Sequence, residues 1–205
     1  MSARSAGPPP GLEALLGRYA DAVRASPHNL LSPRGLAELE TRHIPEALAL
    51  AELLPGGPAL VDVGSGAGLP GMVIALARPD LEVTLVEATA KKARFLERAV
   101  EDLDVGVVVV NARIEADRCL AGRFDLATAR AVAPLDRLVE WVIPILRPGG
   151  RLYAVKGERW RSELDAAGAA LRHVGAEVVA TPPDPRTFTA SVDPPLRTVI
   201  IARSA

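Results

Sequence analysis

The stretch from residue 60 to residue 71 constrains the fold more than any other, and it reads L-V-D-V-G-S-G-A-G-L-P-G. Its apolar start suits an interior strand of a parallel sheet, and its glycines let the backbone turn sharply and approach a ligand closely. Pro70 has a φ angle suited to the first turn of a helix, which is predicted to run from Pro70 to about Arg78. The stretch therefore predicts a strand, a glycine loop and a helix whose free N–H groups face a ligand.

Two classes of nucleotide cofactor bind to such a loop. Gly66, Gly68 and Gly71 match G-x-G-x-x-G, the pattern that binds dinucleotides, and Glu87 ends the next apolar strand, where an acid would bind ribose hydroxyls. Asp62 argues against NAD, because its carboxylate would face a pyrophosphate at close range. A nicotinamide-dependent oxidoreductase is therefore kept as an alternative and is not the first interpretation.

S-adenosylmethionine removes this conflict of charges. It has no phosphate, its ammonium and sulfonium groups are positive, and its one carboxylate can lie at the amino end of the helix. Gly64 and Gly66 would allow its close approach, Asp62 would lie near its cationic part, and Glu87 would hold the ribose. The alternative for Asp62 is that it only stabilises the glycine turn through backbone N–H groups.

Length and composition bound the class of protein. With 205 residues, 49% of them hydrophobic and 24% charged, the chain suits one sizeable core with an appendage. The net charge of -1 argues against a generally basic surface, so a polyanion would have to meet a local patch. Cys119 is the one cysteine, which excludes an intrachain disulfide and a cysteine metal cluster, and no metal is expected. No apolar stretch is long enough to span a membrane, so we expect a soluble, cytoplasmic protein. We also expect a monomer.

The amino-terminal part of the chain divides into two segments. Residues 1–10 are rich in Ser, Gly and Pro and are expected to form a disordered tail. Residues 11–56 are expected to form a small helical cap, whose second helix covers residues 35–54. Arg42 and His43 lie on that helix, where a solvated or packed position is at least as well supported as a ligand contact, and we predict no catalytic role for His43.

Residues 57–205 alternate between strand and helix, which predicts a mostly parallel, doubly wound α/β sheet. Strands are predicted at 60–63, 83–87, 106–110, 124–128, 151–155, 177–180 and 197–202, and helices at 70–78, 91–103, 135–146 and 163–174. The last two strands are joined by the proline-rich stretch 181–195 and are expected to form an antiparallel hairpin. This is the layout of Rossmann-like, S-adenosylmethionine-dependent methyltransferases, an analogy at the level of the fold.

Ligands of open α/β sheets bind beyond the carboxyl ends of the strands, and the remaining candidate residues lie there. They are Asp62, Gly64, Glu87, residues 111–115, Arg130 and Lys156. Ile114 is a candidate to cover one face of the adenine, with core packing equally favoured, and Glu115 is a candidate to read its edge. Residues 127–131 read A-T-A-R-A in place of the Asp/Asn-Pro-Pro-aromatic motif of many amino-group methyltransferases, which argues against an exocyclic amine as acceptor.

Two basic groupings are candidates to bind RNA. Lys91 and Lys92 fall in the first turn of a helix, where the dipole disfavours cations, and the alternative for them is simple solvation. In the second grouping, arginines flank a tryptophan after the fifth strand, which suits phosphate contacts and base stacking. Its members are Arg151, Lys156, Arg159, Trp160 and Arg161. The alternative there is a buried tryptophan with solvated neighbours.

Five motifs in series resemble those of one family. They are D-V-G-S-G-A-G-L-P-G at 62–71, L-V-E with K-K-A-R-F-L within 85–96, A-R-I-E at 112–115, A-R-A-V-A at 129–133 and A-V-K-G at 154–157. Together they are similar to the bacterial small-subunit rRNA guanine-N7 methyltransferase family, RsmG (GidB), over about residues 42–157. The resemblance implies methyl transfer from S-adenosylmethionine to N7 of one guanine in 16S rRNA, near the decoding region, in naked rRNA or in the small ribosomal subunit.

The resemblance also implies roles for residues. The cofactor positions of the family fall on Gly64, Leu69, Ile114, Glu115 and Arg130. Guanine N7 has a lone pair and no proton to lose, so in-line transfer needs positioning and desolvation but no general base. We expect Arg130 to act in catalysis by bridging the cofactor carboxylate and the substrate. A small-molecule methyltransferase and a non-catalytic RNA-binding protein are the alternatives.

Overall fold

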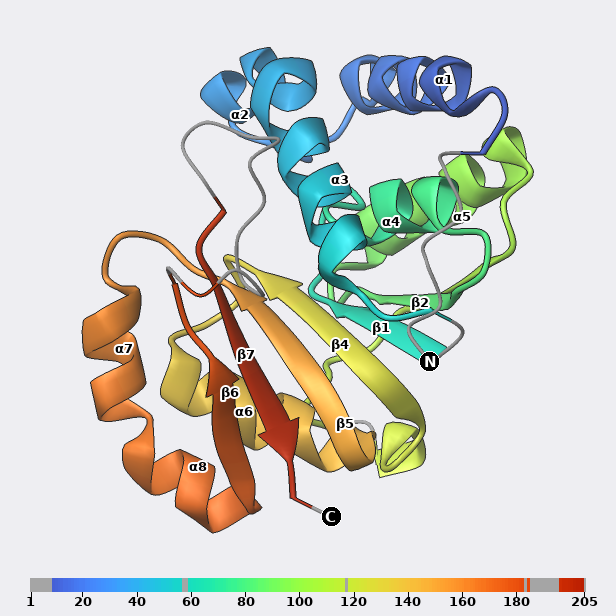
Figure 1. Ribbon diagram of the computed structural model, residues 1–205. Coiled ribbons are helices and arrows are strands. Elements are labelled where there is room, and N and C mark those ends of the chain that lie inside the picture. The colour runs from blue at the N-terminus through green and yellow to red at the C-terminus, as the bar shows by residue number, and fades with distance from the viewer. Residues whose placement is uncertain (1–8, 57–58, 117, 183, 185–195, 205) are drawn as a thin grey trace.

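The computed structural model describes residues 9–56, 59–116, 118–182, 184 and 196–204. It is a seven-stranded sheet with helices packed on both faces (Figure 1). Most of the predicted tail 1–10 and of the predicted loop 181–195 lies outside the described residues. Within the described ranges, no helix has both the length and the apolar character needed to cross a bilayer.

The sheet is mostly parallel. Its strands are β1 (Ala59–Val63), β2 (Glu82–Val86), β3 (Val107–Val110), β4 (Phe124–Arg130), β5 (Leu146–Val155), β6 (Ala176–Ala180) and β7 (Thr198–Arg203). Their order is β3-β2-β1-β4-β5-β7-β6, in which β1 to β5 run parallel and β7 runs antiparallel to both β5 and β6. This confirms the predicted Rossmann-like fold with its C-terminal antiparallel pair.

The helices form one layer on each face of the sheet. They are α1 (Leu12–Ala25), α2 (Pro33–Ala37), α3 (Ile44–Leu53), α4 (Gly71–Ala77), α5 (Ala90–Leu103), α6 (Leu135–Val142), α7 (Trp160–Ala166) and α8 (Gly168–Val174), with short turns η1 (Leu39–His43), η2 (Arg118–Leu120) and η3 (Ile143–Ile145). Figure 1 shows α1 to α5 together on one face and α6 to α8 on the other.

The helix predicted over residues 35–54 is divided into three pieces. Between α2 and α3 lies η1, a single π-helical turn in which the His43 N–H donates to the Glu38 carbonyl at 3.1 Å. Pro45 has no N–H to continue the preceding helix, but it is tolerated in the first turn of a new one, and α3 begins there. Because π-helical turns are rare and occur often at functional sites, the position of Arg42 and His43 on this turn is of interest.

Proline and glycine also explain two other differences from the predicted elements. The helix predicted to reach residue 146 ends in the 3-10 turn η3, because Pro144 cannot continue an α-helix, and β5 begins already at Leu146. The helix predicted to begin at residue 163 begins instead at Trp160 and is divided into α7 and α8 next to Gly168, a residue with low helix propensity.

Two apolar cores fill the space between the sheet and its helices. The first core lies under α1, α3, α4 and α5 and includes Tyr19, Leu50, Met72 and Leu96, all fully buried. The second lies under α6, α7 and α8 and includes Trp160. Because Tyr19 and Leu50 of the cap share the first core with Met72 and Leu96, the predicted cap 11–56 packs as a layer of the same body.

Arg78 ties the cap to the sheet domain. Its Nη1 donates to the carbonyl oxygens of Ala51 at 2.8 Å and Leu54 at 2.9 Å, and its Nη2 donates to that of Pro55 at 3.2 Å. The last carbonyls of a helix have no partners within the helix, so a buried guanidinium satisfies the carboxyl end of α3. Asp80 accepts hydrogen bonds from Arg78 Nε and Nη2 at 2.8 and 2.7 Å, which fixes the guanidinium in this position.

Candidate active site

The strand order brings the candidate cofactor residues into one row. Strands β3, β2, β1 and β4 are adjacent and parallel, so the segments that follow them lie side by side at one edge of the sheet. The row starts after β3 with Ile114 and Glu115, continues with Glu87 after β2 and with the glycine loop 64–68 after β1, and ends with Arg130 on β4.

The glycine loop is held by β2 and open on one side. Gly64, Gly66 and Gly68 have φ angles of 68°, 60° and 98°, which only glycine adopts readily. The N–H groups of Gly64 and Ser65 both donate to the Val86 carbonyl, at 2.8 and 3.1 Å. A Cβ atom added at Gly66 would meet only the Gly64 carbonyl oxygen, at 3.8 Å, so this part of the loop leaves room for a ligand.

Asp62 lies beneath the loop and is fully buried. Its Oδ2 accepts a hydrogen bond from the Gly71 N–H at 3.1 Å, and its Oδ1 accepts one from the Thr128 hydroxyl at 2.8 Å. Burial raises the pKa of Asp62 to about 6, although the hydrogen bonds from Thr128, Ser65 and Gly71 oppose this shift. The geometry is that of the alternative interpretation, in which Asp62 stabilises the turn through a backbone N–H, and contact with the cofactor stays a prediction.

Gly71 shows how tightly this acid is packed. A Cβ atom at Gly71 would lie 2.6 Å from the Asp62 Cβ and 2.4 Å from Leu85 Cδ2. The third glycine of the G-x-G-x-x-G pattern therefore serves helix–sheet packing, as it does in dinucleotide-binding folds.

Glu87 connects the glycine loop to the segment after β2. The side chain is buried, its Oε2 accepts from the Gly66 N–H at 2.9 Å, and its Oε1 accepts from the Thr89 N–H at 2.7 Å. The Asn111 side chain donates to the Glu87 carbonyl at 2.7 Å and adds the segment after β3. Each carboxylate oxygen can accept more than one hydrogen bond, so Glu87 can hold the loop and still receive the two hydroxyls of a ribose.

The other candidate cofactor residues differ in exposure. Leu69 and Ile114 are buried in the two apolar cores, which is also the core-packing alternative for Ile114. Glu115 is on the surface, where its carboxylate lies 3.8 Å from the guanidinium of Arg113. Their contacts with a cofactor stay predictions.

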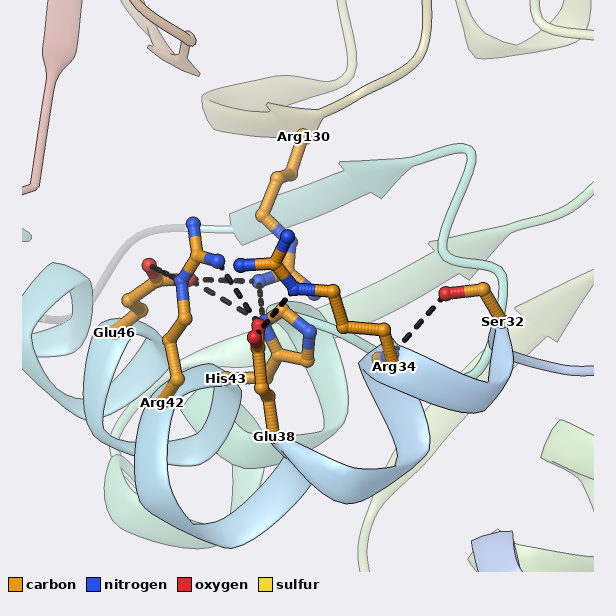
Figure 2. A network of polar contacts seen from close by, with 8 residues as sticks. Ser32, Arg34, Glu38, Arg42, His43, Glu46 and Arg130 are labelled. Atoms are coloured by element: carbon orange, nitrogen blue, oxygen red, sulfur yellow. Dashed lines mark hydrogen bonds and ion pairs between the residues drawn. The ribbon is translucent and has the colours of Figure 1, made fainter.

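Arg130 reaches from the end of β4 to the cap (Figure 2). Its Nη1 lies 3.1 Å from Glu46 Oε2 on α3 and 3.2 Å from His43 Nδ1 on η1. Arg42 Nε donates to the other oxygen of Glu46 at 2.9 Å, and Arg42 Nη1 donates to Glu38 at 3.0 Å. Burial alone would raise the pKa of Glu46, but its contacts with His43, Arg42 and Arg130 outweigh this effect and lower it to about 2.

A cavity of about 520 Å3 opens beside this network, between the cap and the ends of β4 and β5. Val132 joins it to the glycine loop, since Val132 lines the cavity and lies 2.8 Å from where a Cβ at Gly64 would be. Six of the fourteen described residues that line it are charged, namely Arg42, Glu46, Arg130, Lys156, Glu163 and Arg197. Four of these six are cations, so the cavity suits an anionic group.

Sequence reasoning did not find Glu46 or Tyr19. Glu46 is one of many surface-type acids in the sequence, and its contact with Arg130 spans 84 residues. Tyr19 lies on α1, where its hydroxyl donates to the Ala67 carbonyl of the glycine loop at 2.9 Å. Burial raises the pKa of Tyr19 well above its ordinary value, so it stays a neutral donor. The helical spacing of Tyr19 predicts core packing but gives no signal for this polar contact.

The structure separates the two basic groupings. Lys91 and Lys92 lie in the first turn of α5, with Lys91 exposed and Lys92 half-buried. In the second grouping, Lys156 is 7% exposed, with its ammonium 2.6 Å from Glu163 and 2.9 Å from the Ala133 carbonyl oxygen. Its charge is therefore paired within the protein, and its contact with RNA stays a prediction.

Trp160 is also placed differently from the expectation. It is buried in the second core, and its ring is covered by the guanidinium of Arg161 at 4.6 Å from the ring centroid. The indole is thus not exposed for stacking on a base, and the alternative of a buried tryptophan is the one observed. Arg151, Arg159 and Arg161 are exposed.

The residues present fit S-adenosylmethionine. An open glycine loop, a carboxylate fixed against it and an arginine at the next strand end match the nucleoside and the amino-acid part of this cofactor. No group of three His, Cys, Asp or Glu side chains among the described residues is arranged to hold a metal ion.

Solved structures share the fold. TYW2 from M. jannaschii, in complex with AdoMet, has a TM-score of 0.60 at 14% identity over 78% of this chain and 74% of that chain. A 16S rRNA N2 G1207 methyltransferase of T. thermophilus, in complex with AdoMet and guanosine, has a TM-score of 0.52 at 19% identity over 78% of this chain and 39% of that chain. At these identities the likeness establishes the Rossmann-like architecture alone.

Similarity in sequence is much higher to one family. The family model GidB, described as rRNA small subunit methyltransferase G, matches residues 13–184. The ribosomal RNA small subunit methyltransferase G of Mycolicibacterium gilvum is 40% identical over 89% of this chain and 81% of its own length. That of Streptomyces coelicolor is 45% identical over 78% of this chain and 71% of its own length. The chain therefore belongs to the rRNA small subunit methyltransferase G (GidB) family.

Proposed function

We propose that this protein methylates N7 of a specific guanine in 16S rRNA, near the decoding region, with S-adenosylmethionine as the methyl donor. We further propose that it acts as a monomer in the cytoplasm. The proposal rests on the row of residues at the sheet edge. In this row Glu87 accepts a hydrogen bond from the Gly66 N–H, and Arg130 is the last residue of β4, the strand next to β1 and its glycine loop.

Each residue of the row binds a different part of the cofactor. Glu87 accepts the ribose hydroxyls, and the open side of the loop at Gly66 admits the nucleoside. Ile114 and Glu115 receive the adenine from the neighbouring strand end. Arg130 meets the carboxylate, and Asp62 keeps the loop and α4 in register from below. S-adenosylmethionine supplies an electrophilic methyl group on a sulfonium.

Guanine N7, as the acceptor atom, requires few catalytic groups from the protein. Guanine N7 carries an in-plane lone pair and has no proton to lose, so the protein needs no general base for the transfer. Its residues must hold the two reactants in line and exclude water, contributions that can account for a large part of a rate enhancement. We assign Arg130 as the catalytic residue, because it ends the cofactor row and also lines the charged cavity.

Transfer of labelled methyl from S-adenosylmethionine tests the proposal. The acceptors are small ribosomal subunits and stripped rRNA, both from cells that lack the enzyme, followed by chemical cleavage at 7-methylguanine. Label at one guanine of 16S rRNA is the expected result, and the preferred preparation identifies the substrate. Label at another atom or only in small molecules would refute the assignment, and binding of NAD in place of S-adenosylmethionine would refute the cofactor.

A further inference from the structure

The Arg130 guanidinium is held at one of its nitrogens only. Nη1 contacts both Glu46 and His43, whereas Nε and Nη2 form no hydrogen bond with any residue that the structure describes. The side chains of Arg130 and Glu46 are only 18% and 14% exposed, so most of this pair is removed from solvent. Arg130 therefore presents two neighbouring N–H donors that none of the described residues uses.

These two donors form the edge of the guanidinium that binds oxyanions best. A carboxylate or a phosphate can accept from Nε and Nη2 at the same time, which gives a bidentate, charge-assisted pair. Arg130 lines the charged cavity, and Arg197, another residue of its wall, forms no ion pair with the described residues. An anionic group that enters the cavity can therefore meet Arg130 without displacing Glu46.

His43 can orient Arg130 without neutralising it. Guanidinium nitrogens only donate hydrogen bonds, so His43 Nδ1 is placed to accept from Arg130 Nη1 at 3.2 Å, and the same Nδ1 lies 3.5 Å from Glu46 Oε2. Glu46 shares its charge between Arg42 and Arg130, which leaves the guanidinium electrostatically available to an incoming anion.

We propose that Glu46 and His43 of the cap are positioning residues for Arg130. They hold Nη1 against the cap and so aim the Nε–Nη2 edge at an oxyanion in the active site, either the cofactor carboxylate or a phosphate of the rRNA. This inference rests on the proposed function for its substrate, but the coupling between Glu46 and Arg130 is tested separately from the identity of the methylated base.

A double-mutant cycle tests the coupling. Glu46→Gln keeps the shape of the side chain and removes its charge, and it is made in the natural sequence and with Arg130→Lys. We expect Glu46→Gln to lower kcat/KM about tenfold in the natural sequence, since small displacements of positioning groups have effects of this order or larger. With Arg130→Lys present, the further loss should be less than about twofold, because neighbouring groups that act as a unit are not additive.

The matched control is Glu40→Gln. Glu40 also pairs with an arginine of the cap, Arg24, but contacts neither Arg130 nor the cavity. A loss of stability in the cap would affect both variants, so melting temperatures are measured for each. If Glu46→Gln fails to fold, His43→Ala is the second variant. It removes the contact of Arg130 with the imidazole and leaves the Arg130–Glu46 ion pair in place.

Two binding measurements identify the oxyanion. Calorimetry gives the Kd of S-adenosylmethionine, and filter binding gives the Kd of stripped 16S rRNA. Weaker cofactor binding by Glu46→Gln indicates the carboxylate, and weaker rRNA binding indicates the phosphate. Equal losses in both Arg130 backgrounds, or kinetics and affinities unchanged by Glu46→Gln and His43→Ala, would overturn the inference. Failure of the natural enzyme to methylate guanine N7 would overturn the proposed function alone.

Discussion

The two basic regions of the surface look alike in sequence and differ in structure. The α5 basic row consists of Lys91, Lys92, Arg94 and Arg98, none of which forms an ion pair with another described residue. The α7 basic group consists of Lys156, Arg159, Trp160 and Arg161, in which the lysine is paired with Glu163 and the tryptophan is buried. The number of cations does not distinguish the α5 basic row from the α7 basic group. The number of cations without an ion pair to another described residue does.

The α5 basic row also has a shape suited to a polyanion. Lys91, Arg94 and Arg98 share one face of the helix, because they are three and four residues apart. They line a hollow of about 240 Å3 between α1 and α5, together with His28 and Phe95. The row starts in the first turn of α5, close in sequence to Glu87 of the candidate active site. We therefore expect rRNA to contact this face, and the following experiments test the difference between the two regions.

Replacing Trp160 should have the largest effect. Trp160→Ala removes a buried ring from the second core, and we expect the free energy of unfolding to fall by about 3 kcal/mol. Urea denaturation measures this loss. The rRNA affinity of the folded fraction should stay unchanged, and a variant of natural stability that binds rRNA poorly would show that the indole stacks on a base.

The next largest effect is expected at Lys156. Lys156→Met leaves the Glu163 carboxylate, which is 27% exposed, without its cation, and should cost about 2 kcal/mol of stability. Thermal or urea denaturation again gives the value. Adding Glu163→Leu should restore most of the loss, because it removes the unpaired charge. If Lys156→Met instead keeps its stability and loses rRNA binding, the lysine serves the ligand.

The α5 basic row should affect binding and not stability. Lys91→Ala, Arg94→Ala and Arg98→Ala together should weaken rRNA binding about tenfold and reduce the slope of log K against log salt by about 2. Filter binding at several salt concentrations measures both. Arg172→Ala on α8, on the other face of the sheet, is the control and should change neither quantity. An unchanged salt dependence in the triple variant would contradict the assignment.

Arg161 should give the smallest effect. Arg161→Ala removes the contact with the Trp160 ring, and such exposed cation–π pairs contribute about 0.5 kcal/mol. A melting curve detects a loss of this size only against a well-matched natural control. A change of more than twofold in rRNA affinity would mean that the α7 basic group is also part of the interface.

The sequence predicts the sheet and its order of elements well, because alternating apolar runs and glycine or proline breaks are local signals. It places helix ends less well where a proline acts, and Pro45 and Pro144 explain two of the divided helices. In the site, the motif at 62–71 predicts the glycine loop, and the apolar run that ends before Glu87 predicts the acid after β2. It does not decide how Asp62 is used, since that depends on Thr128 from a strand 66 residues away.

The contacts of Arg130 show which interactions cannot be predicted from the sequence. Nothing local marks Glu46 as its partner, because α3 and β4 meet only in the folded chain. The pairing of Lys156 with Glu163 is of the same kind, although the two are only seven residues apart in the sequence. Both ion pairs depend on the direction of side chains at turns, which periodicity does not predict.

The position of β7 has a consequence for the order in which the protein can fold during synthesis. β7 follows β6 in the chain but lies between β5 and β6, and among the described strands β6 is hydrogen-bonded to β7 alone. A nascent chain that has reached β6 can pair β1 to β5, but β6 has no neighbour to join until β7 has emerged from the ribosome. Pairing that waits for distant segments is slow. We therefore expect the backbone amides of α7, α8 and β6 to be the last to become protected from hydrogen exchange.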